Sequence, residues 1–189
     1  MRLGPRLRRS FYARPTLEVA RDLLGKILVY EGPEGFRAAR LVEVEGYLGA
    51  VDPASHAFRG APTGRTAPMF GPPGRTYVYF VYGMYFCMNV VAERAGTAGA
   101  ALLRGAEPVL GLGDDPRALA GPGKLCRALG ITTAQTNWDL VTSPLRIHSA
   151  PQVPDDGVLR TPRIGLNPGA TKHEPWRFVV RGSAGASRG

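Results

Sequence analysis

The sequence predicts a single α+β domain built on a mainly antiparallel sheet. Its 189 residues match the length of one domain, and a hydrophobic content of 44% is enough for a sizeable core. Strand-like segments follow one another without regular helical crossovers, which favours antiparallel pairing. The 25 glycines and 17 prolines predict many turns and long loops rather than a helical bundle. We expect one domain over residues 1–189, with no internal repeat or linker.

The first third of the chain predicts a helix and two strands. Residues 1–10 are a basic arm that we expect to be loose. Thr16 is a candidate helix cap, and the apolar stripe that follows it stops at Gly25. Strands are expected at 26–30 and 36–47, joined by a turn.

The rest of the chain predicts further strands, two short helices and long connections. Residues 49–74 are rich in Gly and Pro, and connections of that length are usually functional or mobile. The elements expected after it are a hairpin at 76–91, strands at 99–106, 145–148 and 176–181, helices at 116–120 and 123–129, and a flexible tail at 182–189.

The hairpin segment TYVYFVYGMYFCMNVV holds six of the sixteen aromatic residues. A half-buried core hairpin has this alternating pattern, but so does a surface that stacks on nucleic-acid bases. The polar Asn89 needs a partner if it is buried. A two-residue turn would place Asn89 with Val78 and Phe80, whereas a three-residue turn around Gly83 would place it with Tyr77, Tyr79 and Cys87.

The strand LVEVEGYLG carries two carboxylates. Period-two alternation predicts that Leu41, Glu43, Glu45 and Tyr47 share one face. This face could be exposed to solvent, or one carboxylate could act as a general base beside an aromatic ring that holds a flat substrate. A metal site made of Glu43, Glu45, Asp52 and His56 is a further interpretation, although its spacing matches no known pattern.

Arg104 ends the apolar run AALLRG. An arginine in such a run either reaches solvent or faces an anion. In the second case, its charge would lower the pKa of an active-site carboxylate and keep it ionised.

The charge balance is compatible with a nucleic-acid partner. The formal net charge is +9, and Lys26, Lys124 and Lys172 are the only lysines. Arginine binds phosphate in a bidentate manner, but a GC-rich genome would also favour arginine. Cys87 and Cys126 form no metal-binding or disulfide framework, which favours a reducing compartment. We expect no secretory signal, no membrane span, no metal and no cofactor.

Six blocks identify a resemblance to a known family. They run from residue 2 to residue 183 and read RLGPRLRRSFYARPTLEVARDLLGKILV, RLVEVEGYLG followed by SHAFRG, MFGPPGRTYVYFVYGMYFCMNVV, ALLRGAEP, GPGKLCRALGI and RFVVRGS. With these blocks, the chain resembles the alkyladenine (3-methyladenine) DNA glycosylases of base-excision repair. The loops at 110–122 and 132–162 match no block.

The resemblance implies a curved, open-barrel-like antiparallel sheet with surrounding helices and a protruding hairpin. It also implies that a damaged purine is flipped out of duplex DNA into a pocket. By position, Tyr82 with Met84 would be the wedge that fills the gap in the stack. The residues that match the base pocket are Tyr47, His56, Tyr79 and Asn89, with Asn89 rejecting normal guanine.

The resemblance assigns catalysis to three positions. Glu45 would be the general base, Arg104 would position the attacking water, and the carbonyl of Val180 would also hold that water. The expected products are a free base and an abasic site, from 3-methyladenine and other alkylated purines, with hypoxanthine and ethenoadenine as further candidates. Because no lysine matches a Schiff-base role, a monofunctional enzyme without strand-cleaving lyase activity is expected.

The same family match implies a monomer that acts on double-stranded DNA. It would be cytoplasmic and nucleoid-associated in a bacterium, or nuclear in a eukaryote. A non-catalytic module that binds damaged DNA is the alternative, but it leaves Glu45 and Arg104 without a purpose.

Overall fold

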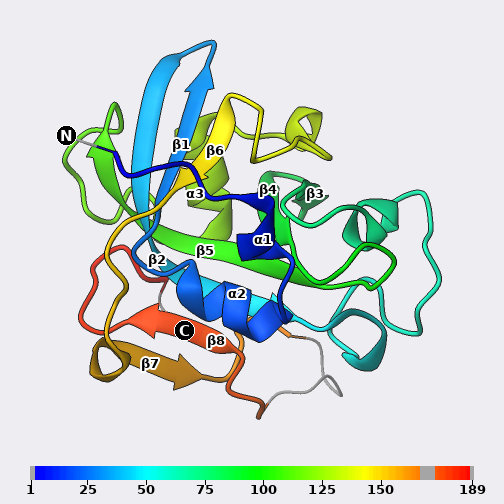
Figure 1. The fold of residues 1–189 in the computed structure, drawn as a ribbon. Coiled ribbons are helices and arrows are strands. Elements are labelled where there is room, and N and C mark those ends of the chain that lie inside the picture. Colours follow the sequence, from blue (N-terminus) through cyan, green and yellow to red (C-terminus); the bar gives the residue numbers. More distant parts are fainter. Residues whose placement is uncertain (1–2, 167–172, 188–189) are drawn as a thin grey trace.

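The fold is a curled antiparallel half-barrel sheet with helices against it (Figure 1). The structure, a computed structural model, describes residues 3–166 and 173–187. Within these residues the strands are β1 (Ile27–Gly32), β2 (Gly35–Tyr47), β3 (Thr76–Val81), β4 (Tyr85–Val91), β5 (Ala100–Leu110), β6 (Leu145–His148), β7 (Val158–Thr161) and β8 (Arg177–Val180). They form one sheet in the order β3-β4-β5-β2-β1-β6, and β8 joins β2 to β7. The expected fold class is confirmed.

The long strand β2 is the centre of this sheet. One of its edges pairs with β5 from Ala38 to Tyr47. Its other edge pairs first with β1, through residues 35–40, and then with β8, through Glu43, Val44 and Glu45. The last third of β2 is therefore enclosed by strands on both sides, which is where its two carboxylates lie.

The core lies between the sheet and two helices. Helix α2 (Thr16–Asp22) packs on β2 and β5, and helix α3 (Pro122–Leu129) packs on β4 and β5. Leu23 from the end of α2, Leu125 from α3, and Val44 and Leu103 from the sheet belong to the same buried cluster. Burial of these apolar side chains fixes the sheet against the helices.

Several expected elements are confirmed with small changes of boundary. The helix expected at 123–129 begins one residue earlier and ends at Leu129, and the residue that caps it, Gly130, adopts the left-handed conformation with φ of 72°. The hairpin is present as β3 and β4, and the strand expected at 99–106 extends to Leu110.

Other expectations are wrong. Residues 116–119 form a turn rather than a helix, because the chain turns back so that Ala120 can pair with Gly105. Thr16 does not cap helix α2. Pro15 occupies the capping position, while the amide and hydroxyl of Thr16 both donate hydrogen bonds to Glu93. The short elements α1 (Arg9–Tyr12) and β7 carry too little periodicity to be found in the sequence.

Both ends of the described chain pack on the domain, where the sequence predicts loose segments. Leu7 is buried, and its amide donates a hydrogen bond to the carbonyl of Ile147. Near the other end, Gly185 is buried, and the amide of Ser187 donates to Glu43. These contacts could not be predicted from the polar composition of the two segments, because they are made by single side chains and by backbone atoms.

Candidate active site

A cavity of about 490 Å³ opens beside the aromatic hairpin. Its wall includes the four residues expected to contact a base, namely Tyr47, His56, Tyr79 and Asn89. The long connection 48–75 supplies a further part of the wall, and Gly165 and Leu166 close another side. Residues that are far apart in the sequence thus converge around one concave surface.

The hairpin presents its ring-bearing face to this cavity because of its turn. Tyr77 pairs with Asn89, Tyr79 with Cys87 and Val81 with Tyr85, which leaves a three-residue turn at 82–84. Residues directly opposite in an antiparallel pair project from the same face. The register that places Asn89 with Tyr77 and Tyr79 is therefore confirmed, and the two-residue alternative is wrong.

The amide of Asn89 has a fixed orientation. Its side-chain nitrogen donates a 3.1 Å hydrogen bond to the carbonyl of Tyr77, and the residue is 4% exposed. This bond satisfies part of a buried amide that would otherwise be costly. The side chain is thereby held at the cavity wall.

His56 reaches the cavity from the long connection. Its Nδ1 lies 2.9 Å from the hydroxyl of Tyr77, and its ring meets that of Tyr79 edge-to-face, with centroids 4.6 Å apart. Burial lowers the pKa of His56 below its ordinary value of 6.5, and the charge of Arg65 lowers it further. His56 is consequently a neutral imidazole at neutral pH.

Tyr82 and Met84 project from the tip of the hairpin. Tyr82 is 80% exposed and Met84 is 65% exposed, although both are large apolar side chains. The left-handed backbone of Tyr82, with φ of 53°, forms part of the turn. Tyr82 also contributes to the rim of the cavity. An exposed ring at this position has no role in the core.

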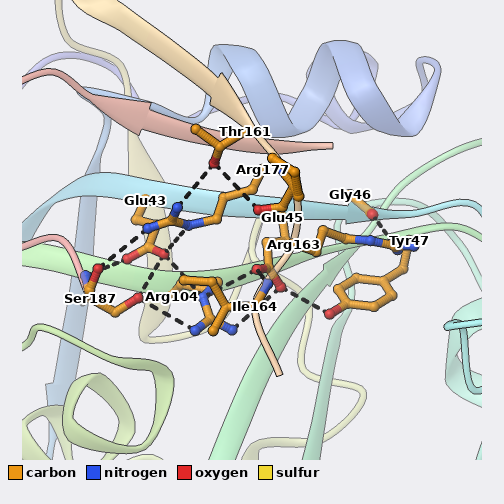
Figure 2. A network of polar contacts seen from close by, with 11 residues as sticks. Glu43, Glu45, Gly46, Tyr47, Arg104, Thr161, Arg163, Ile164, Arg177 and Ser187 are labelled. Atoms are coloured by element: carbon orange, nitrogen blue, oxygen red, sulfur yellow. Dashed lines mark hydrogen bonds and ion pairs between the residues drawn. The ribbon is translucent and has the colours of Figure 1, made fainter. Parts of the chain in front are cut away.

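Glu45 is completely buried and lies beside Tyr47, one of the residues that line the cavity (Figure 2). Its Oε2 accepts a 2.9 Å hydrogen bond from the Tyr47 hydroxyl, and its Oε1 accepts a 2.8 Å hydrogen bond from the amide of Ile164. Glu43, two residues earlier, is also fully buried. The interpretation of this strand face as solvent-exposed is therefore wrong.

Arg104 contacts both carboxylates from a bulge in β5. Glu43 pairs with Gly105 and Val44 pairs with Leu103, so Arg104 is an extra residue in the ladder. Its Nε lies 3.1 Å from Glu43 Oε1 and 3.4 Å from Glu45 Oε1. Bulges commonly re-aim a side chain next to an active site. Of the two positions considered for Arg104, the one against an anion is therefore the one found.

A second bulge corrects the predicted strand face. Leu41 and Val44 belong to the same core cluster, although strict alternation would place them on opposite faces. The cause is that Leu41 pairs with Ala106 and Glu43 with Gly105, which leaves Val42 as an extra residue. Leu41 therefore faces the core and does not share the face of Glu43 and Glu45.

The two carboxylates differ in acidity. Burial raises the pKa of Glu45 above its ordinary value, and the opposing effects of Arg104, the Ile164 amide and Tyr47 do not cancel this. Burial also acts to raise the pKa of Glu43, but hydrogen bonds from Ser187 and Arg177 and the charge of Arg104 bring it below its ordinary value. The expected lowering of the Glu45 pKa by Arg104 is thus present but outweighed. Environments that separate two neighbouring carboxyl groups in this way are a feature of acid–base sites.

Arg163 is a site residue that the sequence did not reveal. Its guanidinium forms a buried ion pair with Asp52, at 2.6 Å, and donates to the carbonyl of Gly46. Its Cζ lies 4.5 Å from the ring centroid of Tyr47 and 4.9 Å from that of Trp176. Asp52 and Arg163 lie 111 positions apart, and no local pattern signals their pairing.

Val180 is the one predicted catalytic residue without a described contact to Glu45. In the pairing of β2 with β8, Glu45 is opposite Arg177. Val180 pairs instead with Val158, and its carbonyl accepts a hydrogen bond from the amide of Ser183. The backbone group that contacts Glu45 is the amide of Ile164.

The residues considered for a metal site do not converge. Asp52 faces Arg163, Glu43 and Glu45 share Arg104, and His56 contacts Tyr77. Over residues 3–166 and 173–187, no group of three potential metal ligands gathers. In the same part of the chain, every helix is too short or too polar to cross a membrane.

Comparison with known proteins agrees with these observations. A sequence model of the family described as Methylpurine-DNA glycosylase (MPG) matches residues 10–184. A Myxococcus xanthus protein with the provisional name 3-methyladenine DNA glycosylase is 48% identical over 181 residues, covering 95% of this chain and 92% of the relative. An equally named protein of Anaeromyxobacter dehalogenans is 49% identical, with 97% and 86% covered. One from Methanocella arvoryzae is 44% identical, with 97% and 96% covered. The chain therefore belongs to the methylpurine-DNA glycosylase family.

Proposed function

We propose that this protein is a DNA glycosylase that releases alkylated purines, 3-methyladenine among them, from double-stranded DNA. Membership of the family and the names of the relatives support this activity. The observation that carries the proposal is the position of Glu45. Its carboxylate is fully buried and accepts a hydrogen bond from the hydroxyl of Tyr47, and Tyr47 lines the cavity. A module that only binds DNA has no need for such a group, because burying an ionisable side chain is costly.

In this proposal the damaged nucleotide leaves the duplex and its base enters the cavity. Tyr47 and Tyr79 offer aromatic rings for stacking, and His56 and Asn89 offer polar contacts at the wall. Tyr82 occupies the gap in the DNA stack, which offsets part of the cost of removing the base. The exposed position of Tyr82 at the rim supports this role.

Glu45 then acts as the general base. It accepts a proton from a water molecule as the water oxygen forms a bond with C1′, while the C1′–N bond breaks and its electron pair leaves with the base. A cationic alkylated purine departs as a neutral molecule, so it needs no separate acid. The negative charge of Glu45 also stabilises the oxocarbenium character of the sugar in the transition state. The raised pKa of Glu45 suits this role, because it makes the carboxylate a better proton acceptor.

We also propose that the enzyme is monofunctional. Strand cleavage by a lyase needs an amine that can form a Schiff base with the sugar. Among the described residues that line the cavity there is no lysine. The product would thus be an abasic site in an intact strand, which breaks only after treatment with hot alkali.

The test uses two substrates and three proteins. Base release is measured by chromatography from methylated DNA, and by alkali-dependent strand breakage of a duplex with one hypoxanthine. Glu45→Gln should bind the lesion duplex but lose at least about 10³-fold in release rate, since it removes both proton transfer and charge stabilisation. Glu31→Gln is the matched control, because Glu31 lies on β1 in a surface ion pair with Arg146.

Each contrary result has a distinct meaning. Binding without release by the wild-type protein, on both substrates, would favour the non-catalytic module. Unchanged turnover by Glu45→Gln would exclude Glu45 as the base. Strand breaks before alkali that disappear with a chelator would point to a metal-dependent nuclease.

A further inference from the structure

The two buried carboxylates of β2 share one guanidinium unequally (Figure 2). Arg104 donates from Nε to Glu43 at 3.1 Å, which is an ordinary hydrogen-bond length. Its contacts with Glu45 are longer, at 3.4 Å from Nε to Oε1 and 3.4 Å from Nη1 to Oε2. Arg104 is therefore placed between the carboxylates rather than in a close, bidentate pair with Glu45.

Glu43 is itself held by two other segments. Its Oε1 accepts a 2.6 Å hydrogen bond from Arg177 Nε on β8 and a 2.7 Å bond from the hydroxyl of Ser187. Its Oε2 accepts a 2.6 Å bond from the amide of Ser187. The Ser187 hydroxyl also lies 3.4 Å from Nη2 of Arg104. Glu43 is thus more tightly bonded than Glu45.

Two glycines allow the segment that carries Ser187 to come this close. A Cβ on Gly105, the residue opposite Glu43, would lie 2.4 Å from the carbonyl oxygen of Gly185. A Cβ on Gly185 would lie 2.4 Å from the carbonyl oxygen of Ala106. The backbones of β5 and of this segment therefore pack directly on each other, and the position of Ser187 follows from that packing.

We propose that Glu43, clamped by Arg177 and Ser187, is a positioning residue that holds the guanidinium of Arg104 between the two carboxylates and prevents it from closing on Glu45. This inference rests on the proposed function, in which Glu45 accepts a proton from water. A close ion pair with an arginine would weaken that proton acceptor, whereas a shared arginine remains available to orient the water. The opposite pKa directions of Glu43 and Glu45 support this arrangement.

Other groups face Glu45 and set the background for any pH measurement. Tyr47 donates to it from β2, and the amide of Ile164 donates from the segment after β7. Tyr79 on β3 and Cys87 on β4 are near enough to interact with its charge. None of these residues is substituted in the variants compared below, so they are common to all the profiles.

The main experiment compares pH–rate profiles of single-turnover base release for the wild type and Glu43→Gln. Without the charge of Glu43, Arg104 should form a shorter ion pair with Glu45 and lower its pKa. The acidic limb of the pH–rate profile should therefore move to lower pH. The plateau rate should fall by about tenfold to a hundredfold, because the base is weaker and the arginine is displaced. Loss of folded protein would lower the amplitude of the profile but would not move its limb.

A double-mutant cycle with Arg104→Met separates positioning from simple charge removal. Removing Glu43 alone also lowers the pKa of Glu45 through the loss of a negative neighbour, with or without Arg104. The positioning role predicts a larger shift of the limb when Arg104 is present than in the Arg104→Met background. Equal shifts in the two backgrounds would overturn it.

The contribution of Ser187 to holding Glu43 in place is tested by a milder pair of variants. Ser187→Ala removes a hydroxyl that contacts Glu43 and Arg104, and should lower the plateau rate by about two- to tenfold. Ser143→Ala, the control, removes a hydroxyl that donates to the carbonyl of Leu145 at the start of β6, and should stay within about twofold. Equal plateau rates for the two variants would show that the Ser187 hydroxyl does not help to hold Glu43.

The two proposals fail in different ways. If the wild type releases no base, or if Glu45→Gln remains active, the proposed function fails and this inference fails with it. If Glu45→Gln is inactive but the limb does not move in Glu43→Gln, only the positioning role of Glu43 is refuted.

Discussion

Replacing Arg163 by methionine should destabilise the protein markedly. Arg163 and Asp52 are both fully buried, and their ion pair has two contacts, of 2.6 and 2.9 Å. Breaking a buried pair by removing one partner typically costs about 3–5 kcal/mol, because the remaining charge stays buried. The amides of Leu48 and Ala54 would still donate to Asp52, so the lower end of this range, about 3 kcal/mol, is expected.

This cost can be converted into a melting temperature. A chain of 189 residues has an unfolding entropy of about 0.4 kcal/mol/K, so a loss of about 3 kcal/mol lowers Tm by about 7 °C. Circular dichroism during heating at pH 7 measures this change. Glu31→Gln is the control, because the Glu31 side chain is 56% exposed and its partner Arg146 keeps the hydrogen bond to the carbonyl of Pro144, so the expected loss is at most about 1 kcal/mol. An equal fall in Tm for both variants would refute the reasoning.

Two further measurements sharpen this test. Adding Asp52→Asn to Arg163→Met removes the unpaired charge and should recover part of the lost stability.

The destabilisation caused by Arg163→Met should also depend on pH. Burial acts to raise the pKa of Asp52, but hydrogen bonds and charge from Arg163 bring it below its ordinary value of 3.8. Such a carboxylate stabilises the fold above its unfolded pKa and loses this effect as pH falls through the folded pKa. The difference in Tm between the wild type and Arg163→Met should therefore become smaller in acid. A difference that does not change with pH would contradict this.

Three other predictions concern DNA and catalysis. Tyr82→Ser should weaken binding to a lesion duplex by about tenfold, and unchanged affinity in a titration would count against the wedge. The rate of base release should rise with pH as Glu45 ionises. Because burial raises the pKa of Glu45, the midpoint of this rise should lie above the ordinary glutamate pKa of 4.5. A limb at or below 4.5 would contradict this. The affinity for DNA should fall steeply as the salt concentration rises. Arg65 is exposed and lines the cavity, so Arg65→Gln should reduce the slope of log affinity against log salt concentration by about one. An unchanged slope would show that Arg65 contacts no phosphate.

The sequence predicted the parts of the site that depend on local order. The position of Asn89 left two hairpin registers open. The family resemblance, which needs Asn89 at the base pocket, selects the three-residue turn around Gly83 that the structure has. The cost of an unpaired charge in an apolar strand limited Arg104 to two positions, in solvent or against an anion, and the structure has the second. In both cases neighbouring residues and one physical rule reduce the choice to two arrangements.

The remaining contacts could not be predicted because they join distant segments. The amide of Ile164 bonds Glu45 across 119 positions, and any residue other than proline offers the same donor. Ser187 bonds Glu43 across 144 positions from a segment of small polar residues that reads as a flexible tail. Neither side-chain type nor periodicity marks such partners, since the chain path alone brings them together.

The bulges at Val42 and Arg104 explain how one strand can serve the core and the site together. Leu41 and Val44 both point into the core, as do their partners Ala106 and Leu103, so the sheet keeps its apolar face on either side of the bulges. Each bulge inserts one residue, on opposite strands, so the register beyond them is restored. Between them, Glu43 lies opposite a glycine, and Arg104, free of the ladder, can turn toward both carboxylates. Regular pairing would place Leu41 on the face of Glu43, so the buried charge network requires the irregularity.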